Sequence, residues 1–117
     1  MQKLCLIFLF LGVVACNAPK RPEGVLTQPQ LAALIVEVYI GEARLDQLPL
    51  TKDSAIRYFI PFEQKLLKTR GISDSTLKKT YAYYLDNPRE LQQVYDSVID
   101  TLVLRDQRTT SAAMPKK

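Results

Sequence analysis

The segment between residues 87 and 102 has the most regular pattern in the sequence, and it determines the class of fold. Apolar side chains recur there every three or four residues, which is the period of one face of an α-helix. These side chains are Leu91, Val94, Tyr95, Val98, Ile99 and Leu102. The run Asn87–Glu90 is typical of a helix start, with asparagine as the N-cap, proline in the first position and glutamate in the third. We expect this helix to end near Arg105 or Arg108.

Two earlier stretches have the same helical period. The first begins with the capping box Thr27–Gln30 and ends near residues 46–48, before Pro49. The other is capped by Ser73 and covers residues 74–86. Their predicted inward faces consist of Leu31, Leu34, Ile35, Val38 and Leu45 in the first, and of Leu77, Tyr81, Tyr84 and Leu85 in the other.

A further helix is predicted between these two. It starts after Thr51 or Asp53 and runs to Arg70, where Gly71 follows as a terminating residue. Pro61 removes one hydrogen bond in its interior, so we expect a kink there or two shorter helices. The side chains expected to face inward are Ile56, Phe59, Ile60, Leu66 and Leu67.

The sequence has no alternating strand pattern, no Asn-Gly or Asp-Gly hairpin signal and no internal repeat. It therefore predicts an all-α fold, a small bundle of about four helices over residues 27–108 with short connections. Residues 109–117 are polar and are expected to form a flexible C-terminal tail.

The N-terminus carries a different pattern, that of a secretory signal. A basic start with Lys3 is followed by an apolar run from Leu4 to Val14, about half the roughly 20 residues that a membrane-spanning helix needs. The run ends Val-Val-Ala-Cys, which resembles the lipobox of bacterial lipoproteins. That resemblance implies cleavage after Ala15, which removes residues 1–15 as a signal peptide, and lipidation of Cys16.

Lipidation would make Cys16 the membrane anchor, since stable anchoring takes at least two acyl chains. Residues 16–26 contain two prolines and a glycine and are predicted to be a tether. An aspartate directly after the lipidated cysteine resembles an inner-membrane retention signal, but this chain has Asn17 there. An acidic cluster after the cysteine resembles a signal for export to the cell surface, but the residues after Asn17 are basic. We therefore expect a cell-envelope protein on the periplasmic face of the outer membrane. Cys5 leaves with the signal, so no disulfide is expected.

Composition disfavours most chemistry. The chain has no histidine, and its net charge of +4 falls to +3 without Lys3. The basic residues do not line one helix face with aromatics, so nucleic acid is not an expected partner. There is no nucleophile motif and no phosphate-binding loop. Asp96 and Asp100 are four residues apart, but a solvated helix face explains them better than a metal site. We expect no catalytic residue, no metal and no cofactor.

Three residues form the candidate site: Glu42, Glu63 and Tyr84. Both glutamates fall on predicted apolar stripes, where a carboxylate must be paired, protonated or directed into a cleft. The favoured interpretation is a buried pair in which each glutamate accepts hydrogen bonds from tyrosine or a basic side chain. A polar pocket for a partner is the alternative. Paired carboxylates also serve glycosidases, but nothing else in the sequence indicates a sugar site.

Several motifs resemble a family of short Gram-negative, Bacteroidota-type lipoproteins built on a domain of unknown function. They are residues 38–45, Tyr58-Phe59, Gly71-Ile72-Ser73, residues 83–88 and residues 94–98. The resemblance covers nearly all of the mature domain and implies a helical lipoprotein without an established activity. A looser similarity is to the N-terminal helical domain of periplasmic chaperones that carry parvulin-type isomerase modules.

These observations lead to two expected functions and disfavour an enzyme. The first is a lipoprotein anchored to the outer membrane, whose helical domain is an accessory subunit that binds another envelope protein. The alternative is a chaperone-like module that holds extended polypeptide in an apolar groove. Either function requires an exposed apolar patch larger than isolated surface residues provide.

Overall fold

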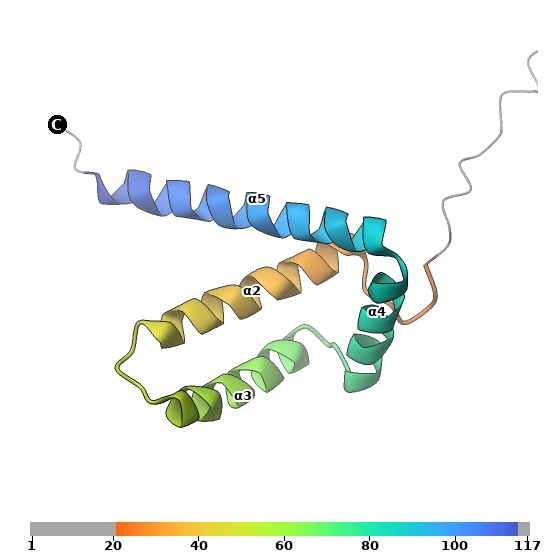
Figure 1. Ribbon diagram of the computed structural model, residues 1–117, viewed down its shortest axis with the longest axis horizontal. Coiled ribbons are helices and arrows are strands. Elements are labelled where there is room, and N and C mark those ends of the chain that lie inside the picture. The colour runs from red at the N-terminus through yellow and green to blue at the C-terminus, as the bar shows by residue number, and fades with distance from the viewer. Residues whose placement is uncertain (1–20, 115–117) are drawn as a thin grey trace, which may run out of the picture.

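The computed structural model describes residues 21–114 of the chain, and the predicted signal peptide and Cys16 lie outside them. The described part contains four helices and no strand (Figure 1), which confirms the predicted all-α bundle. The helices are α2 (Gln28–Asp46), α3 (Lys52–Thr69), α4 (Asp74–Asp86) and α5 (Pro88–Ala113).

Side-chain caps fix the starts of the first three helices. At α2 the capping box is complete, since the Thr27 hydroxyl accepts from the Gln30 amide at 3.3 Å and the Gln30 side chain accepts from the Thr27 amide at 2.9 Å. At α3 the Thr51 hydroxyl accepts from the Ser54 amide, and at α4 the Ser73 hydroxyl accepts from the Thr76 amide. The sequence therefore located these three starts correctly.

Pro61 lies inside a single helix, because α3 runs without interruption from Lys52 to Thr69. Of the two predicted alternatives, the division into two shorter helices does not occur. The end of α3 is fixed by Gly71, whose φ of +67° lets the chain turn back. The Ile72 amide then donates to the Leu67 carbonyl at 2.9 Å, and the Gly71 amide donates to the Lys68 carbonyl at 3.1 Å. This is the predicted glycine termination.

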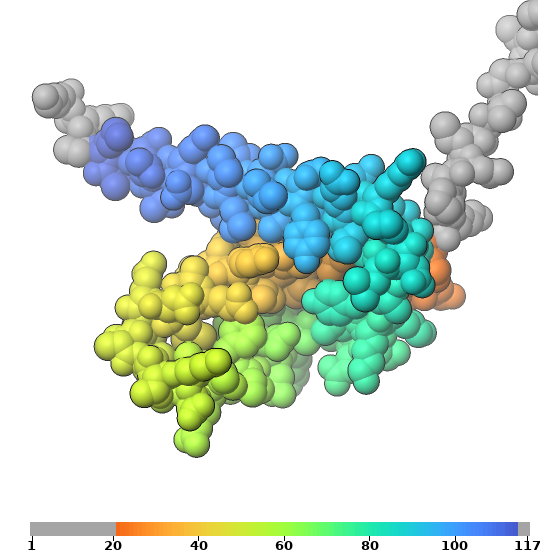
Figure 2. Space-filling model, viewed as in Figure 1, coloured from red at the N-terminus to blue at the C-terminus, as the bar shows by residue number. Residues whose placement is uncertain are grey.

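Helix α2 is the centre of the fold. It lies between α3 and α5, and the Cα atoms of those two helices do not approach within 8 Å of each other. In Figure 1 the three helices lie side by side, while α4 crosses one end and packs on α5. Figure 2 shows the same face, where the surface of α2 remains visible between α5 and α3. The described helices thus form one layer closed at one end.

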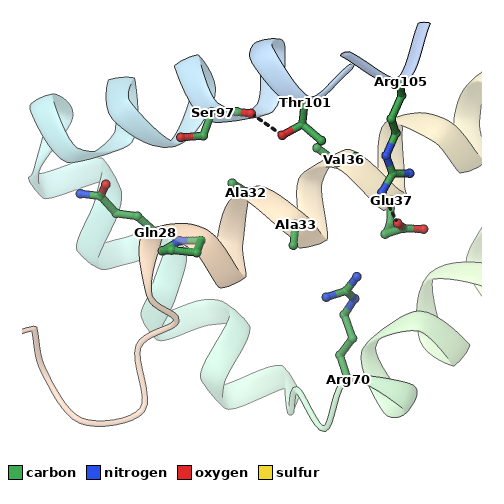
Figure 3. A pocket seen from close by; sticks show the side chains of 10 residues that line it. Gln28, Ala32, Ala33, Val36, Glu37, Arg70, Ser97, Thr101 and Arg105 are labelled. Atoms are coloured by element: carbon green, nitrogen blue, oxygen red, sulfur yellow. Dashed lines mark hydrogen bonds and ion pairs between the residues drawn. The ribbon is translucent and has the colours of Figure 1, made fainter. Parts of the chain in front are cut away.

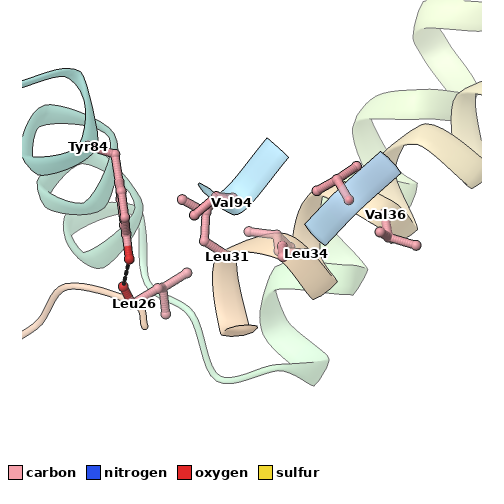
Figure 4. Packing of buried hydrophobic residues seen from close by; sticks show 8 residues of the cluster. Leu26, Leu31, Leu34, Val36, Tyr84 and Val94 are labelled. Atoms are coloured by element: carbon pink, nitrogen blue, oxygen red, sulfur yellow. Dashed lines mark hydrogen bonds between the residues drawn. The ribbon is translucent and has the colours of Figure 1, made fainter. Parts of the chain in front are cut away.

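The buried core is correspondingly small and sits where α2, α4 and α5 meet (Figure 4). Leu31, Leu34 and Val36 of α2 pack with Val94 and Val98 of α5. Tyr84 of α4 and Leu26, which precedes α2, complete the core. Helix α3 contributes no fully buried residue, and of the described helices only α2 brings its Cα atoms within 8 Å of those of α3.

Two features of α5 differ from the prediction. Asn87 occupies the N-cap position as predicted, but its side chain makes no cap hydrogen bond, because the side-chain amide donates to the Tyr83 carbonyl at 2.7 Å at the end of α4. The helix also continues to Ala113, beyond the predicted end at Arg105 or Arg108. No glycine or proline interrupts residues 103–114, so the polar sequence predicted to be a flexible tail propagates the helix.

The predicted apolar faces of α4 and α5 are wider than the surface they bury. Leu85 was predicted to point inward and is 71% exposed, and Ile99 is 57% exposed. Tyr95 is 44% exposed. The helical periodicity placed these residues on apolar faces, but no described helix covers that side of the layer.

Candidate interaction surface

Of the three predicted site residues, only Tyr84 is buried. Its exposed fraction is 0%, and its hydroxyl donates to the Leu26 carbonyl at 2.9 Å. The Leu26 amide donates to the hydroxyl of Thr80, which is also completely buried, at 3.0 Å. Tyr84 therefore has a partner in the backbone, not in Glu42 or Glu63.

These two bonds attach the N-terminal strap, residues 21–26, to α4. Leu26 is 8% exposed, and Val25 packs against the core. The prediction treated residues up to 26 as tether, whereas the strap forms part of the folded domain. Thr80 was missed in the sequence, although its spacing of four residues from Tyr84 placed it on the same helix face.

Glu42 is exposed, so the prediction of a buried carboxylate at this position was wrong. Leu31 and Leu34 of the same stripe are buried, but the stripe is exposed at Glu42. Instead, Glu42 lines a cleft of about 250 Å³ with Leu45 and Asp46 of α2. The facing wall is the α3 surface that carries Ala55, Ile56 and Phe59.

Glu63 lies four residues beyond Phe59, on the same side of α3, and is half-buried. Its neighbour Tyr81 comes from another helix. Burial raises the pKa of the Tyr81 hydroxyl above its ordinary value of 10.0, and the nearby groups of Glu63 and Tyr95 raise it further. Tyr81 of α4 therefore lies near both Glu63 of α3 and Tyr95 of α5.

The cleft and this tyrosine cluster lie on the same side of the layer, and together we call them the open face. Its principal residues are Glu42, Asp46, Ile56, Phe59, Glu63, Tyr81 and Tyr95. Ile56 and Tyr81 are both 47% exposed, so large apolar side chains contact solvent here. The open face joins residues from all four helices, including two of the three predicted site residues.

The open face is acidic, and its carboxylates are unpaired within the described residues. The single ion pair in residues 21–114 joins Arg105 to Glu37 at 3.3 Å, on a different surface of α2. The residues that line the cleft include Glu42 and Asp46 and no basic side chain. With Glu63, three carboxylates border the apolar surface of a chain whose net charge is positive.

The other side of α2 carries a more polar groove, of about 340 Å³ (Figure 3). Ala32 and Ala33 contribute to its floor, and the Arg105–Glu37 pair lies at one end. The side chain of Arg70 extends toward this groove from the end of α3 (Figure 3). The sequence predicted only that Arg70 lies at the end of a helix. It could not predict the direction of the Arg70 side chain, because that direction depends on how α3 packs on α2.

The described residues contain no group of three or more side chains suited to hold a metal ion. Asp96 and Asp100 are exposed on α5, as predicted. No helix in residues 21–114 is long and apolar enough to cross a membrane. What the arrangement offers is an apolar, acidic surface assembled from four helices.

Comparison with known proteins gives a family without an activity. No curated protein and no solved structure matches the chain significantly. A family model does match, and it covers residues 22–108, which include the strap and most of the four helices. The chain belongs to the family described as a domain of unknown function, DUF4296.

Proposed function

We propose that this protein is a lipoprotein of the bacterial outer membrane, anchored through Cys16, whose helical domain binds another envelope protein through the open face. The open face is the observation that carries the proposal. Ile56, Tyr81 and Tyr95 each expose nearly half of their surface while remaining packed at their base. Aromatic side chains in such positions are typical of protein interfaces.

The position of the anchor supports the same function. The lipobox-like sequence ends at Cys16, and the strap begins at residue 21, so few residues separate the lipid from the folded domain. The strap is fastened to α4 by two buried hydrogen bonds. A domain held close to the membrane in this way would present its open face at a limited distance from the bilayer.

The open face favours a specific partner over general polypeptide binding. Its apolar groups are aromatic and β-branched side chains on helices, and it contains no methionine. Promiscuous binding surfaces are typically rich in flexible methionine or loops. A chaperone-like role is therefore the weaker candidate.

Two experiments in the native cell test the two parts of this proposal. The Cys16→Ser variant should incorporate no labelled fatty acid and should leave the membrane fraction, because Cys16 is the proposed attachment. Labelled fatty acid in that variant would refute the anchor. Separately, a photo-crosslinking residue in place of Tyr81 should capture one envelope protein, whereas the same residue in place of Asp100 should capture none.

The crosslinking pattern has a clear opposing outcome. Equal capture from both positions, or no capture from position 81, would show that the open face is not a docking surface. Capture of lipid alone would assign it to the membrane instead. Capture of a second copy alone would make the protein a homo-oligomer, not an accessory subunit.

A further inference from the structure

We propose that the occupant of the open face is a cationic amphipathic helix of the partner protein. The inference rests on the proposed docking function and adds the chemical class of the partner. It follows from two observations. Within the described residues, the open face carries unpaired carboxylates, and no further helix covers the layer formed by α3, α2 and α5 on this side.

The charge argument concerns Glu42, Asp46 and Glu63. None of these carboxylates forms an ion pair in the described residues, although the chain has 16 basic against 12 acidic residues. Of these three, Glu42 and Asp46 are exposed, and Glu63 is half-buried beside Tyr81. Like charges gathered at the edge of an apolar surface are complementary to a partner with basic residues beside its own apolar stripe. They would repel an acidic peptide and an anionic bilayer.

The shape argument concerns the layer itself. Helices α3 and α5 lie on either side of α2, and their Cα atoms do not approach within 8 Å of each other, so part of the α2 surface is visible between them (Figures 1 and 2). Ile56 of α3, Tyr81 of α4 and Tyr95 of α5 each leave nearly half of their surface exposed on this side, as in a bundle that lacks one member. An amphipathic helix placed there would cover them in the manner of helix-in-groove recognition.

The length of the occupant follows from α2. This helix has 19 residues, which corresponds to about 28 Å at the usual rise of an α-helix. Helix α4 crosses one end and limits the open face there. A partner helix of roughly 14 to 18 residues would therefore fill the open face.

The test uses the purified full chain in detergent and two synthetic 18-residue peptides. Both peptides carry leucines at the same helical positions, and they differ only in having lysine or glutamate beside the apolar stripe. The lysine peptide should bind about tenfold more tightly, since each exposed ion pair contributes up to about 1 kcal/mol. Its circular dichroism should become helical on binding.

Matched variants separate the charge from the apolar surface. Glu42→Gln with Glu63→Gln leaves only Asp46 of the three carboxylates, so it should strongly reduce the preference for the lysine peptide and the dependence of its binding on salt. The control is Asp96→Asn with Asp100→Asn, which removes the same charge from the solvated side of α5 and should leave the preference intact. Ile56→Ser should weaken both peptides equally.

Several results would overturn the proposal. These are equal affinity for the two peptides, loss of preference in the Asp96 and Asp100 control, a bound peptide that stays non-helical, or no binding of the lysine peptide. If any of them occurs while position 81 still crosslinks to an envelope protein, the docking function stands and the cationic helix is refuted. If position 81 captures nothing, the docking function fails first.

Discussion

The hydrogen bonds of the strap allow the sharpest test of the structure. Both polar backbone groups of Leu26 are satisfied by α4, the carbonyl by the Tyr84 hydroxyl at 2.9 Å and the amide by the Thr80 hydroxyl at 3.0 Å. Tyr84 and Thr80 are both completely buried, so water cannot replace either partner. Tyr84→Phe and Thr80→Val each remove one partner with little change of shape.

The expected loss of stability follows from the backbone group of Leu26 that each substitution leaves without a hydrogen bond. A buried carbonyl or amide without a hydrogen bond costs about 1–3 kcal/mol. For a domain of this size, each kcal/mol lowers the melting temperature by about 4–8 °C. The double variant should lose less than the sum of the single losses, because a strap released by one substitution no longer depends on the other bond.

Urea unfolding of the purified protein measures these losses, with Tyr83→Phe as the control. The Tyr83 hydroxyl donates to Glu90 at 2.9 Å in a less buried setting, so its removal should cost under about 1 kcal/mol. Equal losses for Tyr83→Phe and Tyr84→Phe would refute the reasoning. Full additivity of Tyr84→Phe and Thr80→Val would also refute it, since it would mean that the strap does not detach as a unit.

The stability loss of the Tyr84→Phe variant should depend on pH. Burial raises the pKa of Tyr84 above 10.0, so folding favours the neutral hydroxyl that donates to Leu26. A group whose pKa rises on folding stabilises the protein fully below its unfolded pKa, and this contribution is lost as the pH passes through the folded value. The stability difference between wild type and Tyr84→Phe should therefore be constant below about pH 10 and shrink above it. A difference that grows with pH would contradict this assignment.

Two further predictions concern packing. Val98→Asp should severely lower the stability of the domain or prevent cooperative unfolding, because it places an unpaired charge in the core. Asp96→Ala should change the stability by less than about 0.5 kcal/mol. Similar effects of the two variants in denaturant unfolding would mean that the wrong face of α5 has been taken as buried. Gly41→Ala should destabilise by about 1–3 kcal/mol despite the better helix propensity of alanine, because a Cβ there would overlap the Phe62 ring. The second substitution Phe62→Leu should recover much of that loss, and a Gly41→Ala variant more stable than wild type would show that α2 and α3 are not in close contact.

Local signals in the sequence were sufficient for the helices but not for their arrangement. Capping residues and Gly71 act within one turn, so Thr27, Thr51 and Ser73 could be read directly. Gly41 lets α3 approach α2 closely, since the Phe62 ring occupies the space that a Cβ would need. The side-chain cap at Asn87 does not form because two helices share that residue, and its side chain serves the first.

Periodicity located the apolar stripe that contains Glu42 but could not show whether another element covers it. The stripe suggested burial, and burial suggested a pair with Glu63 or Tyr84. In the structure Leu31 and Leu34 of that stripe are buried in the core, whereas Glu42, nearer the end of α2, is exposed. A carboxylate such as that of Glu42 would need a partner inside a core, but it needs none where it is exposed to solvent. Nothing in the sequence distinguishes these cases, since both give the same spacing.

Because α3 packs mainly on α2, we expect it to be the least stable helix of the domain. This helix has no fully buried residue and holds to α2 mainly through half-buried side chains such as Phe62 and Leu66. An element with so few buried contacts opens more readily than α2, which lies between two neighbours. A partner bound to the open face would contact α3 through Ile56 and Phe59 and bury its second side. Binding would therefore stabilise α3 more than any other helix, so the least stable part of the domain is also the part that recognition would order.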